Sequence, residues 1–283
     1  YIESRPDSAL TVLEAIDIET LSSNEERAKY SLYMSMALDK NYIDKTDFEV
    51  LQPAIDYYKN HGSATDKLRT FYYQGRIYQN GADSEKAMNC FVNALESSVS
   101  SDDHITIARC FYSQGTIYQH MYDWKKVIES NINASNYFKF SNNVNSQFRS
   151  LLRAINGYSQ LYDTNKASEI ILQANTLLPQ VSFANKGFYY ATCISFYSDN
   201  EMIEELRSML SEYINNIPKE RIDWISVAYA YTILNDYEMA NSAILNISGD
   251  QTTNARYYAL VSDIYRHNND FKSALTSYEK YIH

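Results

Sequence analysis

Glycine and proline are scarce in this sequence. Its 283 residues include only 7 glycines and 4 prolines, the residue types that most often interrupt helices and build turns. Sheets and long loops need more turn-forming residues than this chain supplies. Because 45% of the residues are hydrophobic, the chain can bury a large core. The composition therefore predicts an all-α protein that is helical over almost its whole length.

Cysteine and histidine are also few, and neither shows a metal-binding spacing. Cys90, Cys110 and Cys193 contain no CxxC pair, which excludes a full disulfide framework and a cysteine-rich zinc site. A bond between Cys90 and Cys110 stays open, since their helices should be neighbours. The five histidines match no HExxH pattern, and GxSxG, GxGxxG and GxxxxGK[ST] are absent. We therefore expect no cofactor, no metal and no catalytic residue.

Long apolar runs and excess positive charge are missing as well. The longest apolar candidate, Val227 to Leu234, falls far short of the roughly 18 residues that span a bilayer as a helix. The formal net charge of −10 disfavours nucleic acid and anionic membranes as partners of the whole surface, because both repel an anion. We predict neither nucleic-acid binding nor direct membrane insertion by this segment, while a local basic patch remains compatible with the composition.

The two ends of the sequence carry expectations of their own. The chain begins at Tyr1 without a methionine or a signal sequence, so we expect a processed product or a piece of a longer protein. At the other end, the helix predicted over residues 271–281 has an apolar face that a further repeat would bury. We expect that the natural protein continues there or that this end associates with another molecule.

One spacing organises most of the chain. Phe71, Gly75 and Tyr78 stand at offsets of 0, 4 and 7, which puts them on one face of a helix. Ala87 and Phe91 begin the same pattern on a second helix. Glycine and alanine at the crossing let the two backbones approach while aromatic rings fill the space around them. The segment therefore predicts an antiparallel helical hairpin.

The same register returns to the end of the chain. The large residue at the first position recurs at Phe111, Leu151, Tyr190, Trp224 and Tyr258. In five of the six units an aspartate stands just before the second helix, namely Asp83, Asp123, Asp163, Asp236 and Asp270. An aspartate there accepts free backbone N–H groups and interacts favourably with the helix dipole. We interpret these acids as helix caps rather than catalytic acids.

This register resembles the tetratricopeptide repeat, a helix-turn-helix unit of about 34 residues. The resemblance covers residues 68 to 283 and implies a right-handed α-α superhelix of about six to seven helical hairpins. We expect a single solenoid over residues 1–283, with irregular N-terminal helices at 1–62, three longer repeats at 63–181 and three repeats of near family length at 182–283. In the second unit Asn131 replaces the expected aromatic, which predicts a less well packed hairpin.

The N-terminal part carries a second resemblance. The runs RPDSALTVLEAID, ALDKNYIDKTD and AIDYYKNHG are similar to the beginning of tetratricopeptide lipoproteins in the envelope of anaerobic Gram-negative bacteria. This resemblance covers residues 1 to 80. It implies an extracytoplasmic scaffold or sensor and a location in the bacterial cell envelope or periplasm, with a cytoplasmic location left open.

The candidate binding residues lie on the first helices, opposite the face that packs within each hairpin. The predicted peptide-binding groove comprises Arg69, Tyr72, Arg76, Gln79, Arg109, Tyr112, Gln119, His120, Arg149 and Arg153. Arg69, Arg109 and Arg149 recur every 40 residues and should form a ladder on adjacent helices. Guanidinium groups pair bidentately with carboxylates, so the ladder favours an extended acidic peptide or a carboxylate terminus. The competing interpretation is that these arginines pair with nearby acids of the chain or are merely solvated.

The sequence thus predicts a non-enzymatic scaffold that binds a protein or peptide, with acidic peptides as one candidate partner. The alternative is a ligand-sensing extracytoplasmic domain of a membrane-anchored signalling protein. A minor alternative is a glycosidase, since helical-hairpin toroids can place two carboxylates face to face and the chain has 35 acidic residues.

Overall fold

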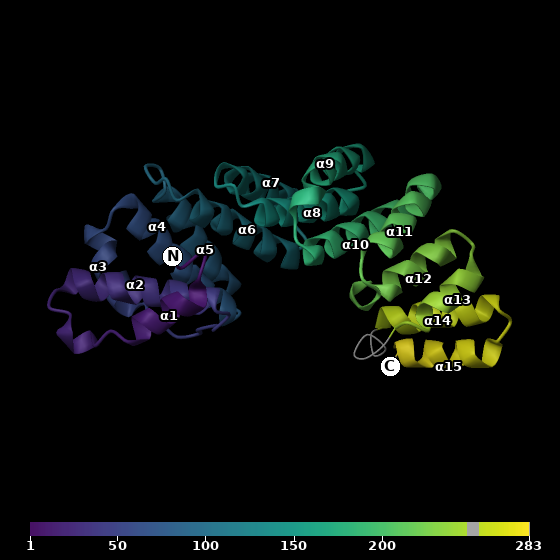
Figure 1. Cartoon of the computed structure of the whole chain (residues 1–283), viewed down its shortest axis with the longest axis horizontal. Coiled ribbons are helices and arrows are strands. Elements are labelled where there is room, and N and C mark those ends of the chain that lie inside the picture. The colour runs from purple at the N-terminus through teal and green to yellow at the C-terminus, as the bar shows by residue number, and fades with distance from the viewer. Residues whose placement is uncertain (248–254, 283) are drawn as a thin grey trace. The chain divides into compact units, whose positions relative to one another are not determined.

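The computed structural model describes residues 1–247 and 255–282, and over these residues all regular secondary structure is helical (Figure 1). The chain divides into two compact units, residues 1–154 and 155–283. The division falls inside one helix, α8 (Val144–Gln160). Each unit is described by itself.

The first unit contains seven helices and the beginning of α8 among the described residues. The helices are α1 (Pro6–Glu14), α2 (Asn24–Lys40), α3 (Gln52–His61), α4 (Ala64–Asn80), α5 (Ser84–Glu96), α6 (His104–His120) and α7 (Trp124–Phe140), with a short 3-10 turn at Ile18–Thr20. Hairpins form between α2 and α3, α4 and α5, and α6 and α7. Because α2, α4 and α6 also contact one another in order, they make a common layer, called the inner layer below.

The second unit repeats this arrangement. Its helices are α9 (Thr164–Leu177), α10 (Phe183–Asp199), α11 (Ile203–Asn216), α12 (Trp224–Ile233), α13 (Tyr237–Ile244), α14 (Ala255–His267) and α15 (Phe271–Ile282), with 3-10 turns at Leu178–Gln180 and Lys219–Arg221. Hairpins form between α10 and α11, α12 and α13, and α14 and α15, and the last pair is clear in Figure 1. Here α10, α12 and α14 contact one another in order and form the inner layer.

The predicted aspartate caps are confirmed. Oδ1 of each predicted aspartate accepts a hydrogen bond of 3.0 to 3.2 Å from the backbone N–H three residues later. The aspartates are Asp83, Asp123, Asp163, Asp236 and Asp270. Each cap satisfies one of the N–H groups that a helix leaves unpaired at its start, a contribution of about 1 kcal/mol in a typical protein.

The crossing predicted between Gly75 and the second helix is also present. A Cβ atom on Gly75 would lie 2.6 Å from Cε1 of Phe91, whose ring is fully buried between α4 and α5. In the next hairpin Asn131 takes the place of this ring against Gly115. Asn131 is fully buried and donates from Nδ2 to the backbone oxygen of Val127 at 2.8 Å. Its Oδ1 atom has no partner within the described part of the chain, so the second hairpin buries an amide where the first buries a ring.

Helix length follows the long spacing of the first repeats. The first helices α4, α6 and α8 each have 17 residues, whereas α12 has 10 and α14 has 13. The exception is α10, which also has 17 residues, although it belongs to the repeats at 182–283 that were predicted to have nearly the usual family length.

Three further expectations concern the cysteines, the membrane and the last helix. All three cysteines are free and buried, so the bond left open between Cys90 and Cys110 is not formed. No helix in the described ranges is long and apolar enough to cross a membrane. On α15, Leu275 and Ile282 are more than half exposed, in agreement with the apolar face expected there.

Candidate functional site

Three of the predicted groove arginines, Arg69, Arg76 and Arg109, lie on the inner layer of the first unit, and two of them join successive helices. Arg69 on α4 places Nε 2.6 Å from Oδ2 of Asp103, the residue that caps the start of α6. Arg76, two turns further along α4, places Nε 2.9 Å from Oδ1 of Asp39 on α2. All four side chains are less than one third exposed. The two ion pairs therefore hold α4 to the helices on both sides of it.

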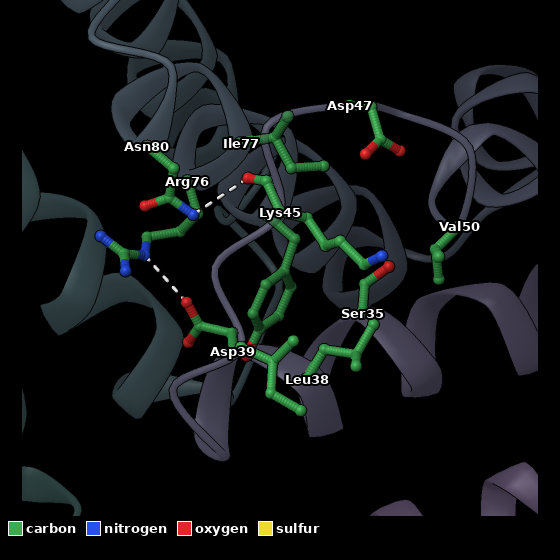
Figure 2. Close-up of a pocket in the computed structure, with 11 residues that line it drawn as sticks. Ser35, Leu38, Asp39, Lys45, Asp47, Val50, Arg76, Ile77 and Asn80 are labelled. Atoms are coloured by element: carbon green, nitrogen blue, oxygen red, sulfur yellow. Dashed lines mark hydrogen bonds and ion pairs between the residues drawn. The ribbon is translucent and has the colours of Figure 1, made fainter.

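Figure 2 shows the contact between α2 and α4 at Arg76. Beside the ion pair, Nδ2 of Asn80 donates to the backbone oxygen of Lys45 at 3.0 Å. The pocket enclosed there has a volume of about 20 Å³, close to the space that one water molecule occupies. Arg76, Asp39 and Asn80 are therefore engaged in contacts between α2 and α4.

Arg109 on α6 has a partner from the far end of the unit. Its Nη1 and Nη2 atoms donate to the two carboxylate oxygens of Glu3 at 2.7 and 2.5 Å. Nζ of Lys40, the last residue of α2, lies 3.8 Å from the same carboxylate. Burial acts to raise the pKa of Glu3, but the hydrogen bonds and charge of Arg109 hold that pKa below its usual value. Two cations thus share one carboxylate.

These contacts decide between the two interpretations for two arginines of the ladder and for Arg76. Arg69, Arg76 and Arg109 pair with acids of the chain itself, and Gln79 accepts a hydrogen bond of 2.8 Å from Arg76. The repeat pattern pointed to none of the acids that pair with them, because Asp39, Asp103 and Glu3 lie outside the repeated groove positions. These arginines are therefore structural ion pairs in this conformation rather than an open row of cations.

Tyr72 requires a correction. It is only 5% exposed, and its ring centroid lies 4.9 Å from that of Tyr73 and 5.9 Å from that of Phe91. Burial raises the pKa of its hydroxyl. The prediction that Tyr72 lines the groove is wrong, because a residue adjacent to Phe71 is rotated by about 100° on the helix and here reaches the core.

Arg153 on α8 is in a different situation. Its Nη1 atom donates to Oγ1 of Thr116 at 2.6 Å, and its guanidinium carbon lies 4.1 Å from the ring centroid of Tyr112. Within the described residues no carboxylate comes within ion-pair distance of Arg153. Burial, reinforced by the charge of Arg149, lowers its pKa. Arg153 is thus a partly buried cation, and the ring of Tyr112 and the hydroxyl of Thr116 fix the orientation of its guanidinium group.

Arg153 forms a cationic and polar surface with Tyr112, Thr116 and Arg149, which we call the Arg153 site. Arg149 lies one turn earlier on α8 and is exposed. Gln119 and His120 are exposed at the end of α6. Of the ten predicted groove residues, the structure therefore brings Tyr112, Arg149 and Arg153 together in one place, where Arg149 is exposed and the other two are half-buried.

The second unit has a hollow of its own on its inner layer. A pocket of about 410 Å³ is lined by residues of α10, α12 and α14, including Asp199, Tyr229 and Arg256. Burial raises the pKa of Asp199. The repeat register placed Arg256 at the ladder position, but Asp199 and Tyr229 were missed although both stand at groove positions of the register. Tyr229 follows Trp224 by five residues, as Arg76 follows Phe71, and Asp199 follows Tyr190 by nine, as His120 follows Phe111. The predicted groove was drawn only from the first three units.

The Arg69–Asp103 pair leads to a pH prediction. Burial acts to raise the pKa of Asp103, but Arg69 and the hydrogen bonds from Thr106 hold it below 3.8. A carboxyl with a lowered folded pKa stabilises the protein above its unfolded pKa and loses this contribution as the pH falls through the folded pKa. Asp103→Asn keeps a good helix cap but removes the charge. We expect it to lower the free energy of unfolding by about 1–2 kcal/mol at pH 7 and by much less at pH 3.

Urea denaturation of both proteins at pH 7 and pH 3 measures this difference. Asp163→Asn is the matched control, because Asp163 is also a cap but makes no ion pair within the described ranges. We expect a change under about 0.5 kcal/mol for the control. An equal loss at both pH values in Asp103→Asn would show that the charge of Asp103 does not stabilise the fold.

Comparison with solved structures identifies the class of fold. PilF of Pseudomonas aeruginosa is 10% identical to this chain, with a TM-score of 0.60 over 86% of this chain and 100% of PilF. A Rap protein complexed with competence and sporulation factor is 10% identical, with a TM-score of 0.55 over 98% and 92% of the two chains. NprR in complex with its cognate peptide NprX is 14% identical, with a TM-score of 0.52 over 98% and 89%.

These similar structures are tetratricopeptide-type repeat proteins, so the helical-hairpin solenoid predicted from the register is confirmed. No protein-family model matches the sequence, and the comparison with curated proteins finds no match.

Proposed function

We propose that the chain is a non-enzymatic scaffold that binds a protein or peptide on the inner layer of its helical hairpins. The Arg153 site carries this proposal. A guanidinium that is stacked on Tyr112 and oriented by Thr116 is already fixed in one plane, so binding a carboxylate sacrifices little side-chain freedom. Its charge has no acid beside it in the described residues, and a ligand carboxylate would supply one.

The similar structures support the same kind of function. Two of them hold a bound factor or peptide, namely the Rap protein with competence and sporulation factor and NprR with NprX. Their likeness to this chain extends over 98% of its length. A solenoid of hairpins offers an extended inner surface on which consecutive residues of a peptide contact consecutive helices.

The ligand that fits the Arg153 site is a segment with a carboxylate. Arg153 and the exposed Arg149 provide two guanidinium groups one turn apart on α8, and guanidinium groups form bidentate hydrogen bonds with carboxylates. Thr116 and Gln119 add uncharged groups on α6. The envelope location and the sensor role expected from the N-terminal resemblance stay predictions.

Selection from a phage library of random 12-residue peptides tests the proposal. The chain is immobilised, and enriched peptides are synthesised and titrated by fluorescence anisotropy against the wild type, Arg153→Gln and Arg149→Gln. We expect the affinity to fall at least tenfold in Arg153→Gln, since the lost bond is charge-assisted. The exposed Arg149→Gln variant should also bind more weakly and carries little risk of misfolding.

Arg207→Gln is the control, because Arg207 is an exposed arginine on a second helix, α11. It should leave the affinity unchanged within twofold. Equal binding of the enriched peptides to all four proteins would place their contact elsewhere on the surface and overturn the Arg153 site, and a library from which nothing is enriched would overturn the scaffold function.

A further inference from the structure

The first residues of the chain lie on the inner layer of the first unit. Glu3 reaches Arg109 on α6 and Lys40 on α2, and Ile2 packs against the buried core of these repeats. The backbone oxygen of Pro6 accepts a hydrogen bond of 2.8 Å from Asn41. Residues 1–5 thus occupy the surface on which the proposed function places a ligand.

The charges beneath this segment are not balanced without it. The side chains of Lys40 and Arg109 are 19% and 14% exposed. The nearby acids are already engaged, since Asp103 pairs with Arg69 and Asp39 pairs with Arg76. Glu3 is the acid that pairs with both Lys40 and Arg109 among the described residues. If Glu3 leaves, two neighbouring cations remain without a carboxylate, an arrangement that favours the entry of another one.

The segment itself is held by few contacts. Tyr1 is 68% exposed and the side chain of Glu3 is 40% exposed. Residues 1–5 form only a single turn, in which the N–H groups of Ser4 and Arg5 both donate to the oxygen of Tyr1. Segments with little buried apolar area open at low free energy. Glu3 can therefore leave the two cations without unfolding the repeats that carry them.

An apolar hollow adjoins the N-terminal segment, with Glu3 and Arg69 among its lining residues. It has a volume of about 400 Å³ and is lined by the N-terminal segment together with Val12, Tyr33 and Met36. Ile2 and Glu3 both line this hollow. A ligand that matches the segment would therefore carry an apolar side chain followed by a carboxylate. The same order of groups would satisfy the site when it comes from another molecule.

We propose that Lys40 and Arg109 form a carboxylate-binding site for an acidic segment of a partner protein, and that Glu3 is the intramolecular occupant with which this segment competes. The proposal rests on the proposed scaffold function and adds a second, gated contact to it. The Arg153 site is open to a ligand at once, whereas the Lys40–Arg109 site accepts one only when residues 1–5 move away.

A fluorescein-labelled hexaglutamate peptide is the probe for the test, with hexaglutamine as its uncharged counterpart. Binding is measured by anisotropy with the whole chain, and every variant carries Arg153→Gln so that the Arg153 site does not contribute. Against this background, Glu3→Gln removes the competing carboxylate without changing the size of the side chain. We expect it to bind hexaglutamate at least tenfold more tightly than the background protein and to leave hexaglutamine binding unchanged.

Two variants control for the change in net charge and for the site. Asp7→Asn removes one negative charge from the exposed start of α1, where Asp7 makes no ion pair among the described residues, and should change binding less than twofold. Adding Arg109→Gln to Glu3→Gln should abolish the gain. Circular dichroism before titration verifies that each variant is folded, and Glu3→Ser serves as a second way to remove the carboxylate.

The outcomes separate this inference from the scaffold function. If Glu3→Gln and Glu3→Ser bind hexaglutamate no better than Asp7→Asn, the competition by Glu3 is refuted, even when library peptides still depend on Arg153. If the gain survives Arg109→Gln, the peptide binds elsewhere and the site is wrong. If the affinity of the library peptides does not depend on Arg153 but Glu3→Gln binds hexaglutamate more tightly, the Arg153 site is refuted and the Lys40–Arg109 site is supported.

Discussion

Replacing Phe91 with alanine is expected to lower the free energy of unfolding of the first unit by about 3–5 kcal/mol, the usual range for deleting a buried phenylalanine ring. The ring is fully buried and fills the space above Gly75 between α4 and α5. Its loss removes apolar area from the core and leaves a cavity at the crossing of a hairpin, where two rigid helices limit the collapse of the surroundings.

The wild type and the variant are compared by urea denaturation, with Trp124 as the probe. The chain has two tryptophans, Trp124 in the first unit and Trp224 in the second. In a Trp224→Phe background the fluorescence change therefore reports the first unit. Val92→Ala is the control, because Val92 neighbours Phe91 on α5 but is 40% exposed, and it should cost under about 1 kcal/mol.

A double-mutant cycle with Gly75 makes the cause of this loss specific. In the wild type, Gly75→Ala pushes a methyl group against the ring, since the added Cβ would lie 2.6 Å from Cε1 of Phe91, and we expect a loss of about 1–3 kcal/mol. In the Phe91→Ala background the clash is gone, and alanine is the better helix former by about 1 kcal/mol. Gly75→Ala should then be neutral or stabilising. Additive losses would show that the two residues do not share one packing site.

Replacing Lys40 with methionine is expected to stabilise the first unit at pH 7 by about 1–2 kcal/mol. Burial, and after it the charge of Arg109, lowers the pKa of Lys40 from 10.5 to about 8. The attraction of Glu3 does not offset these two effects. The charge on Lys40 therefore opposes folding, and an apolar side chain of similar length avoids that cost.

The pH dependence gives the sign of this effect. Between pH 8 and 10.5 the unfolded chain holds a proton on Lys40 that the folded chain releases, so wild-type stability rises with pH in this window, and the penalty is fully present below pH 8. The variant lacks this rise. We expect the difference between Lys40→Met and wild type to be largest at pH 7 and to shrink steadily towards pH 10.

Urea denaturation with Trp124 as the probe at pH 7, 8, 9 and 10 measures this difference, because the other titrating groups are common to both proteins. Lys29→Met, an exposed lysine on the same helix, should change the stability by under about 0.5 kcal/mol at every pH. Destabilisation by Lys40→Met at pH 7 would mean that the ion pair with Glu3 outweighs burial. A cation kept at a position where it opposes folding is a common feature of functional sites.

The hairpins were readable from the sequence because they are local. Gly75 and Phe91 are only 16 residues apart. The 3.6-residue period puts them on the facing sides of the two helices of one hairpin, and this follows without any information from the rest of the chain. The capping aspartates are equally local, since each accepts from a backbone group three residues away. Such features depend only on residues that lie close together in the sequence.

The candidate site was readable only in part. The 40-residue period put Arg69, Arg109 and Arg149 at equivalent places on successive helices, but it contained no information on which acid reaches which arginine. Glu3 shows this limit most clearly, because it lies 106 residues from Arg109 in a segment outside the repeats. Tyr72 shows another: a rotation of one residue on the helix decides between groove and core.

The sequence by itself determined that this protein is a solenoid of helical hairpins, where five of its second helices begin, and that Gly75 and Phe91 cross in their hairpin. These properties follow from periodicity and short-range hydrogen bonds. Only the tertiary structure decided which cations are open to a ligand. It paired Arg69 and Arg76 between neighbouring helices, covered Arg109 and Lys40 with Glu3, and left Arg153 on Tyr112 without an acid among the described residues. Ion pairs form between whatever side chains the packing of distant helices brings within about 4 Å, and no local pattern encodes that distance.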